Sequence, residues 1–310
     1  MTQDDAVTKG DTNAVSIDDQ ANYVPPKYVI GYVIAVWSVT WAFVGLALAA
    51  GIKLYDLWYG IVFVNLTMLI PAILAVVFNT LQRKPARAQL RPLTRHVTAT
   101  SVIFAIAFPV VLIFGIAAIC LVTGLGTLNA NALGPALPGT LFLVSIVATV
   151  LYFPFAFGEE YGWRAYLLPA LTVRHGKTRA ATLVGLIWGP WHLAIWIYEA
   201  LAGGASPLHA GVDVSIGIAT AFAMSFPFAY CYFLSGNVLP CALLHVLYDD
   251  FLVGFVFAKG GLVSSGSYPV VLMIVGFALI PVFIWRFHRI ETPWLPKGKE
   301  RPYTPPTEPA

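Results

Sequence analysis

The sequence predicts an all-α membrane protein, a polytopic bundle of about eight transmembrane helices. Of its 310 residues, 58% are hydrophobic and only 11% are charged, whereas soluble domains carry about 25% charged residues. The mean hydropathy is +0.77. Several windows of about 20 residues or more carry no charge, which is enough for a helix to cross a hydrocarbon core about 30 Å thick. Water-soluble classes of protein are therefore excluded.

Eight apolar segments follow one another along the chain. The expected spans are residues 28–51, 57–81, 97–122, 139–172, 180–198, 214–234, 238–258 and 269–287. The fourth is long enough for a span plus an extra turn, and Pro169 is expected to bend it near one end. We find no repeat between the two halves, which disfavours an inverted-repeat transporter. Residues 28–290 are therefore expected to form one helical membrane domain.

The two ends of the chain are polar and lie outside the expected spans. Residues 1–27 contain five aspartates and lack the pattern of a cleavable signal peptide. Residues 291–310 are rich in proline and polar groups. Both segments are expected to be disordered tails.

Basic residues set the expected orientation, because loops rich in lysine and arginine stay in the cytoplasm. The segment QRKPARAQLRPLTRH after the second span carries five of them. Placing it inside puts both termini inside, together with about 15 of the 18 basic residues. We expect an integral membrane protein of a prokaryotic type of cell membrane, with both termini cytoplasmic. The formal charge of +3 gives no reason to expect nucleic acid binding.

Ionisable side chains inside spans are costly in hydrocarbon, so each one marks a candidate functional site. They fall in three of the expected spans. The fourth contains Glu159, Glu160 and Arg164, the fifth contains His192, and the seventh contains His245, Asp249 and Asp250. A helix rises about 1.5 Å per residue, so the depth of each residue can be counted from the expected inner edge of its span. By this count, the polar residues of all three spans can reach one cavity in the middle of the membrane.

Helical spacing separates these residues by role. Glu160 and Arg164 are four apart and share a face, which suits an ion pair. Glu159 is turned about 100° away and is expected to be free for chemistry. An unpaired carboxylate beside an existing pair suits a general base. His245 and Asp249 are also four apart, so both can point at one site.

A carboxylate and two imidazoles that converge on a pocket with water can drive peptide hydrolysis, because they can activate the water and stabilise an oxyanion. Glu159, His192 and His245 also match the set of two His and one Glu that holds a catalytic zinc ion. The residues leave both routes open, so a divalent metal such as zinc is an optional cofactor. The HExxH and GxSxG motifs of other hydrolases are absent from the sequence.

Three motifs in chain order carry a family resemblance. They are Glu159-Glu160-x-x-x-Arg164, an aromatic residue (Trp188) followed by x-x-x-His192, and His245-x-x-x-Asp249. Over about residues 140–260 they resemble the CPBP family of intramembrane proteases. That family includes the CAAX prenyl endopeptidases and the bacterial Abi or "CAAX protease self-immunity" proteins. Trp188 stands where phenylalanine is usual, and the third motif ends in Asp249, where the family usually has asparagine or aspartate.

The resemblance implies an intramembrane endopeptidase that cleaves a peptide or a membrane-associated protein at the lipid bilayer. It implies that Glu159 activates the attacking water with help from His192. It also implies that His245 and Asp249 bind the oxyanion or orient the site. Whether the substrates are prenylated, and whether the enzyme is a glutamic-type or a metallo-endopeptidase, stays open.

The remaining polar pair, Glu160 with Arg164, is expected to support this geometry or to contact the substrate. Trp188 and Trp191 flank His192, where they would line an apolar substrate groove or pack. Two other functions stay open from the residues alone. One is a non-catalytic partner, such as a bacteriocin immunity or protein-sorting protein, and the other is a proton-coupled transporter. The three cysteines are expected to be small buried hydrophobes.

Overall fold

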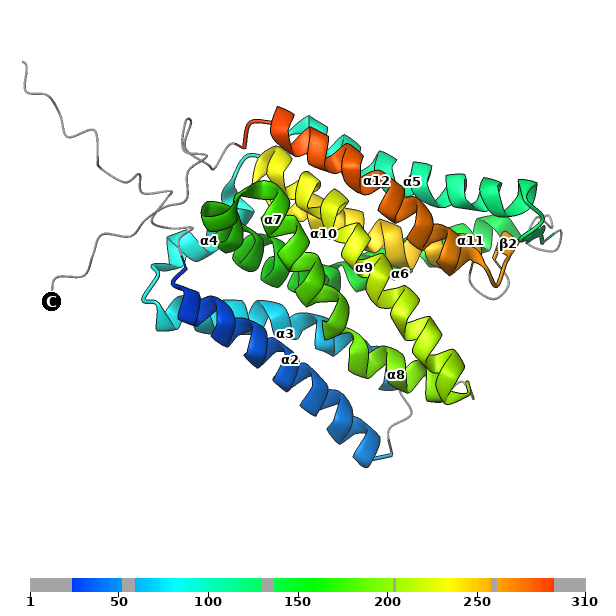
Figure 1. The fold of residues 1–310 in the computed structure, drawn as a ribbon, viewed down its shortest axis with the longest axis horizontal. Coiled ribbons are helices and arrows are strands. Elements are labelled where there is room, and N and C mark those ends of the chain that lie inside the picture. The colour runs from blue at the N-terminus through cyan, green and yellow to red at the C-terminus, as the bar shows by residue number, and fades with distance from the viewer. Residues whose placement is uncertain (1–23, 52–58, 130–136, 203–204, 258–260, 293–310) are drawn as a thin grey trace, which may run out of the picture.

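The computed structural model describes residues 24–51, 59–129, 137–202, 205–257 and 261–292. These residues form an all-helical bundle (Figure 1), which confirms the predicted fold class. A two-residue strand pair, β1 (Thr127–Leu128) with β2 (Val263–Ser264), joins two connections. The predicted disorder of the two tails falls on residues that lie almost wholly outside the described ranges.

Long apolar runs become long helices, because in lipid a helix satisfies its backbone polar groups within its own segment. The helical elements are α2 (Pro26–Ala49), α3 (Tyr59–Leu81), α4 (Ala86–Thr94), α5 (Ala99–Val122), α6 (Leu137–Glu160), the π-helix η2 (Tyr161–Leu167), α7 (Leu168–Trp191), α8 (Leu193–Ala202), α9 (Pro207–Ser235), α10 (Leu239–Val246), the π-helix η3 (Leu247–Val253), α11 (Gly254–Phe257) and α12 (Tyr268–Arg289). The Thr98 hydroxyl caps α5 by accepting from the Ser101 amide at 3.2 Å.

Within the described residues, six helices are long and apolar enough to cross a membrane, judged by length and composition. A bent pair, Thr149–Trp191 with Leu193–Glu199, meets at 41° and raises the number to seven if it counts as one span. The predicted fourth and fifth spans both fall in this pair. The short segment expected between them contains Gly176, whose left-handed φ of 76° places a kink between two helices. The count of eight spans therefore stays a prediction.

The α6–η2 junction lies inside the bundle. α6 packs against α3 and α10, and α9 packs against α7 and α12. In Figure 1, α2 and α3 run along the lower side of the bundle, and α5 and α12 run along the upper side. The charged residues at the end of α6 are therefore surrounded by other helices rather than by lipid.

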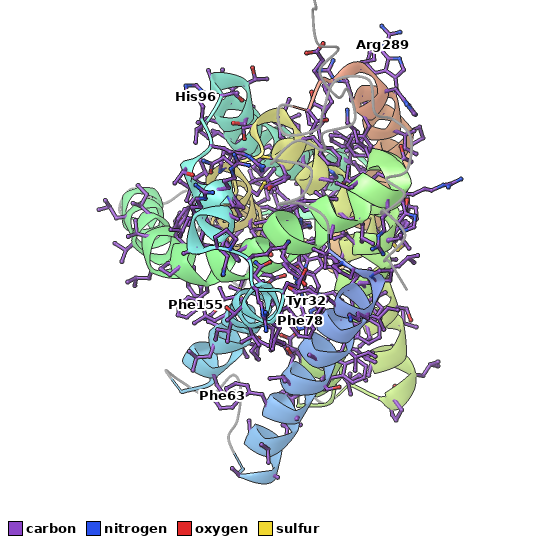
Figure 2. The ribbon with its side chains drawn as sticks, turned by 90° about the vertical axis from the view of Figure 1, so that its left-hand side faces the viewer. Tyr32, Phe63, Phe78, His96, Phe155 and Arg289 are labelled. Carbon is purple, nitrogen blue, oxygen red and sulfur yellow. The ribbon has the colours of Figure 1, made fainter. Side chains whose placement is uncertain are left out.

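The start of η2 lies directly against α2 and α3. A Cβ atom on Gly162 would lie 2.5 Å from the Tyr32 hydroxyl and 2.7 Å from the carbonyl carbon of Pro71. The Tyr32 hydroxyl donates to the Pro71 carbonyl oxygen at 3.2 Å. Its ring meets that of Phe78 edge to face, with centroids 5.9 Å apart (Figure 2). A glycine at position 162 thus allows the helix with the two glutamates to approach α3 closely.

Both ends of the helical domain lie at one end of the bundle, beside α4 (Figure 1). Arg174 donates to the Val24 carbonyl at 2.8 Å, and Lys177 donates to the Ile290 carbonyl at 2.6 Å. These bonds tie the start of α2 and the end of α12 to one turn of α7. We call this end, which carries Lys84, Arg91, Arg95, Arg174 and Lys177, the basic end. The positive-inside rule predicts that basic residues gather on the cytoplasmic side of the membrane. The cytoplasmic location of the basic end stays a prediction.

Candidate active site

The structure brings the predicted polar residues together from three parts of the chain. Glu159 and Glu160 end α6, Arg164 lies in η2, His192 follows α7, His245 lies in α10 and Asp249 lies in η3. Two π-helices, η2 and η3, therefore adjoin the cluster. Such helices are rare and occur mainly at functional sites. Residue periodicity carries no signal for either of them.

The predicted ion pair between Glu160 and Arg164 is present. Arg164 Nη1 donates to Glu160 Oε1 at 2.7 Å, and both side chains are fully buried. The guanidinium also lies over the rings of Trp188 and Phe228, at 4.2 Å and 4.5 Å from their centroids. The faces of aromatic rings attract cations. The carboxylate and the two rings together reduce the cost of burying the arginine charge.

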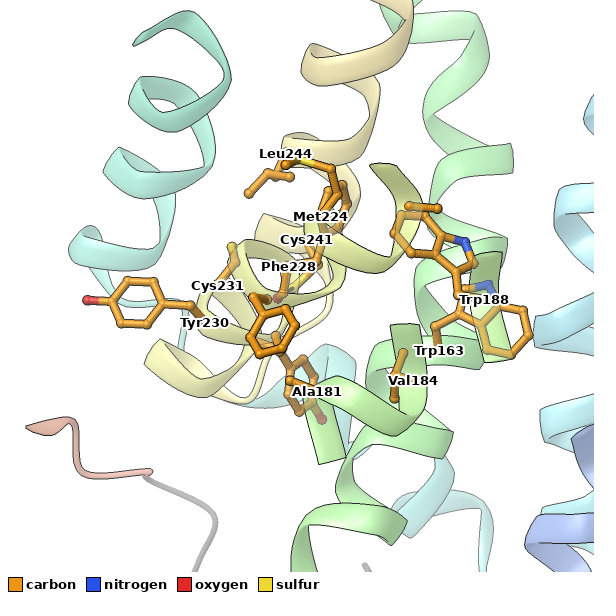
Figure 3. Close-up of a cluster of buried hydrophobic side chains, with 14 of the residues drawn as sticks. Trp163, Ala181, Val184, Trp188, Met224, Phe228, Tyr230, Cys231, Cys241 and Leu244 are labelled. Carbon is orange, nitrogen blue, oxygen red and sulfur yellow. Dashed lines mark hydrogen bonds between the residues drawn. The ribbon is translucent and has the colours of Figure 1, made fainter. Parts of the chain in front are cut away.

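An apolar cluster surrounds these rings (Figure 3). Trp188 and Phe228 lie there with Leu244 and with the thiols of Cys231 and Cys241, all of them buried. All three cysteines of the chain are buried free thiols, as predicted. Charges beside such an apolar cluster interact more strongly than they would in water, because the local dielectric constant is low.

His245 lies between two carboxylates. Its Nδ1 is 2.8 Å from Glu160 Oε1, and its Nε2 is 3.2 Å from Asp249 Oδ2. The expected convergence of His245 with Asp249 is therefore observed, and Glu160 has a second partner besides Arg164. An ionised carboxylate can only accept hydrogen bonds. When both carboxylates are ionised, both ring nitrogens carry a proton and the ring is a cation.

Glu159 lies outside the Glu160–Arg164 ion pair, as predicted, and it has a neutral hydrogen-bond donor as a partner. The indole Nε1 of Trp188 donates a hydrogen bond to Glu159 Oε1. Trp188 is one helix away from Glu159, so spacing within a single helix could not reveal the contact. Because an indole is only a donor, it positions the carboxylate without neutralising it.

His192 lies at the break between α7 and α8, as the C-cap of α7, rather than within a continuous span. Its Nδ1 is 3.0 Å from the Trp188 carbonyl oxygen. Because a carbonyl oxygen only accepts, Nδ1 carries the proton in the neutral ring and Nε2 keeps its lone pair. That Nε2 atom is 3.9 Å from Glu159 Oε1. Two acceptors therefore face each other across a short gap.

Tryptophan side chains stabilise the bend between α7 and α8 at which His192 lies. Trp196 stacks on the imidazole, with ring centroids 4.4 Å apart. Trp191 Nε1 donates to the Thr40 hydroxyl at 2.8 Å, and Trp41 Nε1 donates to the Trp191 carbonyl at 3.1 Å. Spacing along the sequence predicted Trp191 beside the site but did not indicate Trp196 or Trp41. Thr40 and Trp41 lie in α2, about 150 residues from Trp191 along the chain. Residue spacing within one helix cannot predict such contacts.

The side chains of the cluster differ in their exposure. Glu159 and His245 are 2% and 3% exposed, whereas His192 is 18% exposed and Asp249 is 50% exposed. His192 and Asp249 are therefore the two more accessible members of this set.

The ligand set considered for zinc, Glu159 with His192 and His245, is not arranged around one point. Among the residues that the structure describes, no group of three or more His, Cys, Asp or Glu side chains is placed to hold a metal ion. Both ring nitrogens of His245 face other carboxylates, those of Glu160 and Asp249. Neither nitrogen thus offers a lone pair to a cation bound at Glu159. The residues as arranged do not fit a metal centre.

Residues 137–251 match the protein family described as type II CAAX prenyl endopeptidase, Rce1-like. The match runs from the start of α6 into η3, so it contains every residue of the cluster described above. It confirms the resemblance carried by the three motifs, over a region close to the expected 140–260. No curated protein matches the chain.

Proposed function

Since residues 137–251 belong to the Rce1-like family of type II CAAX prenyl endopeptidases, we propose that this protein hydrolyses a peptide bond with a water molecule activated by Glu159 and His192. The family itself supports a CAAX protease-type intramembrane endopeptidase with a membrane-associated peptide substrate. The observation that carries the finer proposal is the 3.9 Å separation of Glu159 Oε1 from His192 Nε2.

One water molecule fits between these two acceptors. Hydrogen bonds of about 2.8 Å to each atom form a triangle on the base of 3.9 Å. The water then donates one proton to the carboxylate and the other to the imidazole, and its oxygen lone pairs face away from both. As the oxygen attacks the scissile carbonyl carbon, Glu159 takes the first proton as general base. The protonated Glu159 then gives that proton to the leaving amine.

His245 supplies the positive group for the oxyanion that forms. Its Nε2 faces Asp249, whose side chain is half exposed. A substrate carbonyl oxygen can replace the Asp249 carboxylate as the acceptor of this N–H group. Glu160 holds the opposite ring nitrogen at 2.8 Å. A charged donor fixed in place before the reaction stabilises a developing oxyanion strongly.

The surroundings of His192 favour an apolar peptide as substrate. Trp196 stacks on the imidazole and Trp191 meets it edge to face, with centroids 4.4 Å and 4.7 Å away. Aromatic rings give large apolar contact areas. We therefore propose that apolar side chains flank the scissile bond.

Purified protein in liposomes is expected to cleave at least one member of a library of membrane-tethered apolar peptides, and to do so in the presence of a chelator. None of the steps above uses a metal ion. Mass spectrometry of the products with and without EDTA measures both expectations. Absence of cleavage across the library would contradict the proposed function. Loss of cleavage in EDTA, with recovery in added zinc, would replace the acid–base route by a metal-dependent one.

Trp188→Phe is expected to lower kcat by roughly 10- to 100-fold, because loss of the indole N–H group frees Glu159 to move from the productive geometry. The phenyl ring still covers Arg164, so the fold should hold. Steady-state kinetics on the cleaved peptide measures the effect. Trp285→Phe, at an exposed position of α12, is the matched control and should keep its activity. An unchanged kcat for Trp188→Phe would show that the indole does not position the base.

A further inference from the structure

A second polar site lies at the basic end, between α4 and η2. A cavity there is lined by Lys84, Arg91 and Arg95 on one side and by Tyr161 and Tyr166 on the other. Among the described residues, no aspartate or glutamate lines it. The cavity is small, with a volume of about 30 Å³, which suits one small polar group rather than a whole drug-sized ligand.

The three cations are held close together and partly out of water. Burial lowers the pKa of Lys84 to about 8. Burial also lowers the pKa of Arg95, and the charge of Arg91 lowers it further. The Arg95 guanidinium contacts two neutral acceptors, the Tyr232 hydroxyl at 3.4 Å and the Gly236 carbonyl at 3.3 Å. An anion in the cavity would favour the charged forms of Lys84 and Arg95.

The position of α4 indicates what kind of anion can enter. α4 connects two apolar helices, α3 and α5, and lies at the end of the bundle (Figure 1). Leu90 on this helix is 51% exposed, while Arg91 faces the cavity. A short amphipathic helix at the end of membrane spans lies at the depth of lipid headgroups. Basic pockets at this depth bind anionic headgroups.

We propose that this cavity binds the phosphate group of an anionic phospholipid. Arg91 and Arg95 provide planar groups that match phosphate oxygens, and Lys84 provides a point charge. The bound headgroup would fasten α4 to η2, where the Tyr161 hydroxyl already donates to the Gln89 carbonyl at 2.7 Å. The proposal concerns binding alone and is independent of the proposed peptidase function.

The test is lipid retention by the full-length protein in detergent micelles with equal amounts of phosphatidylglycerol and phosphatidylcholine, measured by native mass spectrometry. The wild type is expected to retain phosphatidylglycerol selectively. Arg91→Gln and Lys84→Gln should each lower this retention about fivefold, since each basic residue near an anionic surface contributes about 1 kcal/mol. Arg87→Gln is the matched control, because Arg87 is exposed on the same helix and does not line the cavity.

Three results would overturn the proposal. Equal losses for Arg87→Gln and Arg91→Gln would mean that the basic surface attracts lipid without a defined site. Equal retention of the two lipids by the wild type would mean that the phosphate site is not selective for anionic lipid. Displacement of the lipid by millimolar inorganic phosphate would assign the cavity to a soluble anion. Lys84 precedes α4 and Arg91 lies within it, so equal losses from both variants with unchanged thermal unfolding would support the cavity itself.

Discussion

Glu159→Gln is expected to lower kcat for peptide cleavage by roughly 100- to 10,000-fold, the range of a lost general base. The glutamine keeps the size of the side chain, and its amide oxygen can still accept the hydrogen bond from Trp188. It cannot take the proton of the attacking water. KM should change little, because the proposed contacts to the scissile carbonyl come from His245. Steady-state kinetics on a membrane-tethered peptide measures both constants.

Glu199→Gln is the matched control for this experiment. Glu199 lies in α8, outside the cluster around Glu159, and is itself partly buried. The same loss of one carboxylate there should leave kcat unchanged. Full activity of Glu159→Gln would remove this residue from the mechanism. An equal loss in the two variants would show that the substitution damages the fold rather than the chemistry.

Glu160→Gln is expected to destabilise the fold by about 3–5 kcal/mol, the cost of leaving a buried charge without its partner. Glu160 Oε1 accepts from Arg164 Nη1 at 2.7 Å and lies 2.8 Å from His245 Nδ1. Within the part of the chain that the structure describes, Arg164 Nε and Nη2 have no hydrogen-bond partner. Glu160 thus carries most of the compensation for this arginine. Unfolding in mixed micelles measures the change in stability.

The double variant Glu160→Gln/Arg164→Met tests the cause of that loss. It removes both charges, and a methionine can fill the space over Trp188 and Phe228. We therefore expect it to be more stable than Glu160→Gln alone. Folded Glu160→Gln should also keep more activity than Glu159→Gln. A double variant as unstable as the single one would contradict the charge argument, and the reverse order of activities would make Glu160 the base.

Much of the fold follows from composition and local spacing. Apolar windows long enough to cross a membrane must be helical, because lipid leaves the backbone no other partner. The sequence did not reveal that the fourth and fifth expected spans meet at a short interruption. Gly176 breaks the helix through one left-handed residue, within the short polar stretch 174–179. The basic residues on both sides of it suggested a longer connection.

Only the contacts between residues of the same helix could be predicted for the candidate site. The pairs Glu160 with Arg164 and His245 with Asp249 are four residues apart and do contact each other. The contact of His245 with Glu160 spans 85 residues, and that of Trp188 with Glu159 spans 29. Contacts between helices depend on how the helices pack, which residue spacing does not encode. The second contact of Glu160, toward His245, was hidden for this reason.

Because of the π-helix η2 (Tyr161–Leu167), the direction of the two glutamates depends on the number of residues in this stretch. The hydrogen bonds of η2 run from residue i to i+5, so each turn holds one residue more than an α-helical turn. Deleting one residue here would allow α6 and α7 to join as one regular α-helix. It would also turn Glu159 and Glu160 by about 100° relative to Leu168 and the residues that follow. A relative with one residue fewer in this stretch could keep all six polar residues and still misdirect its glutamates.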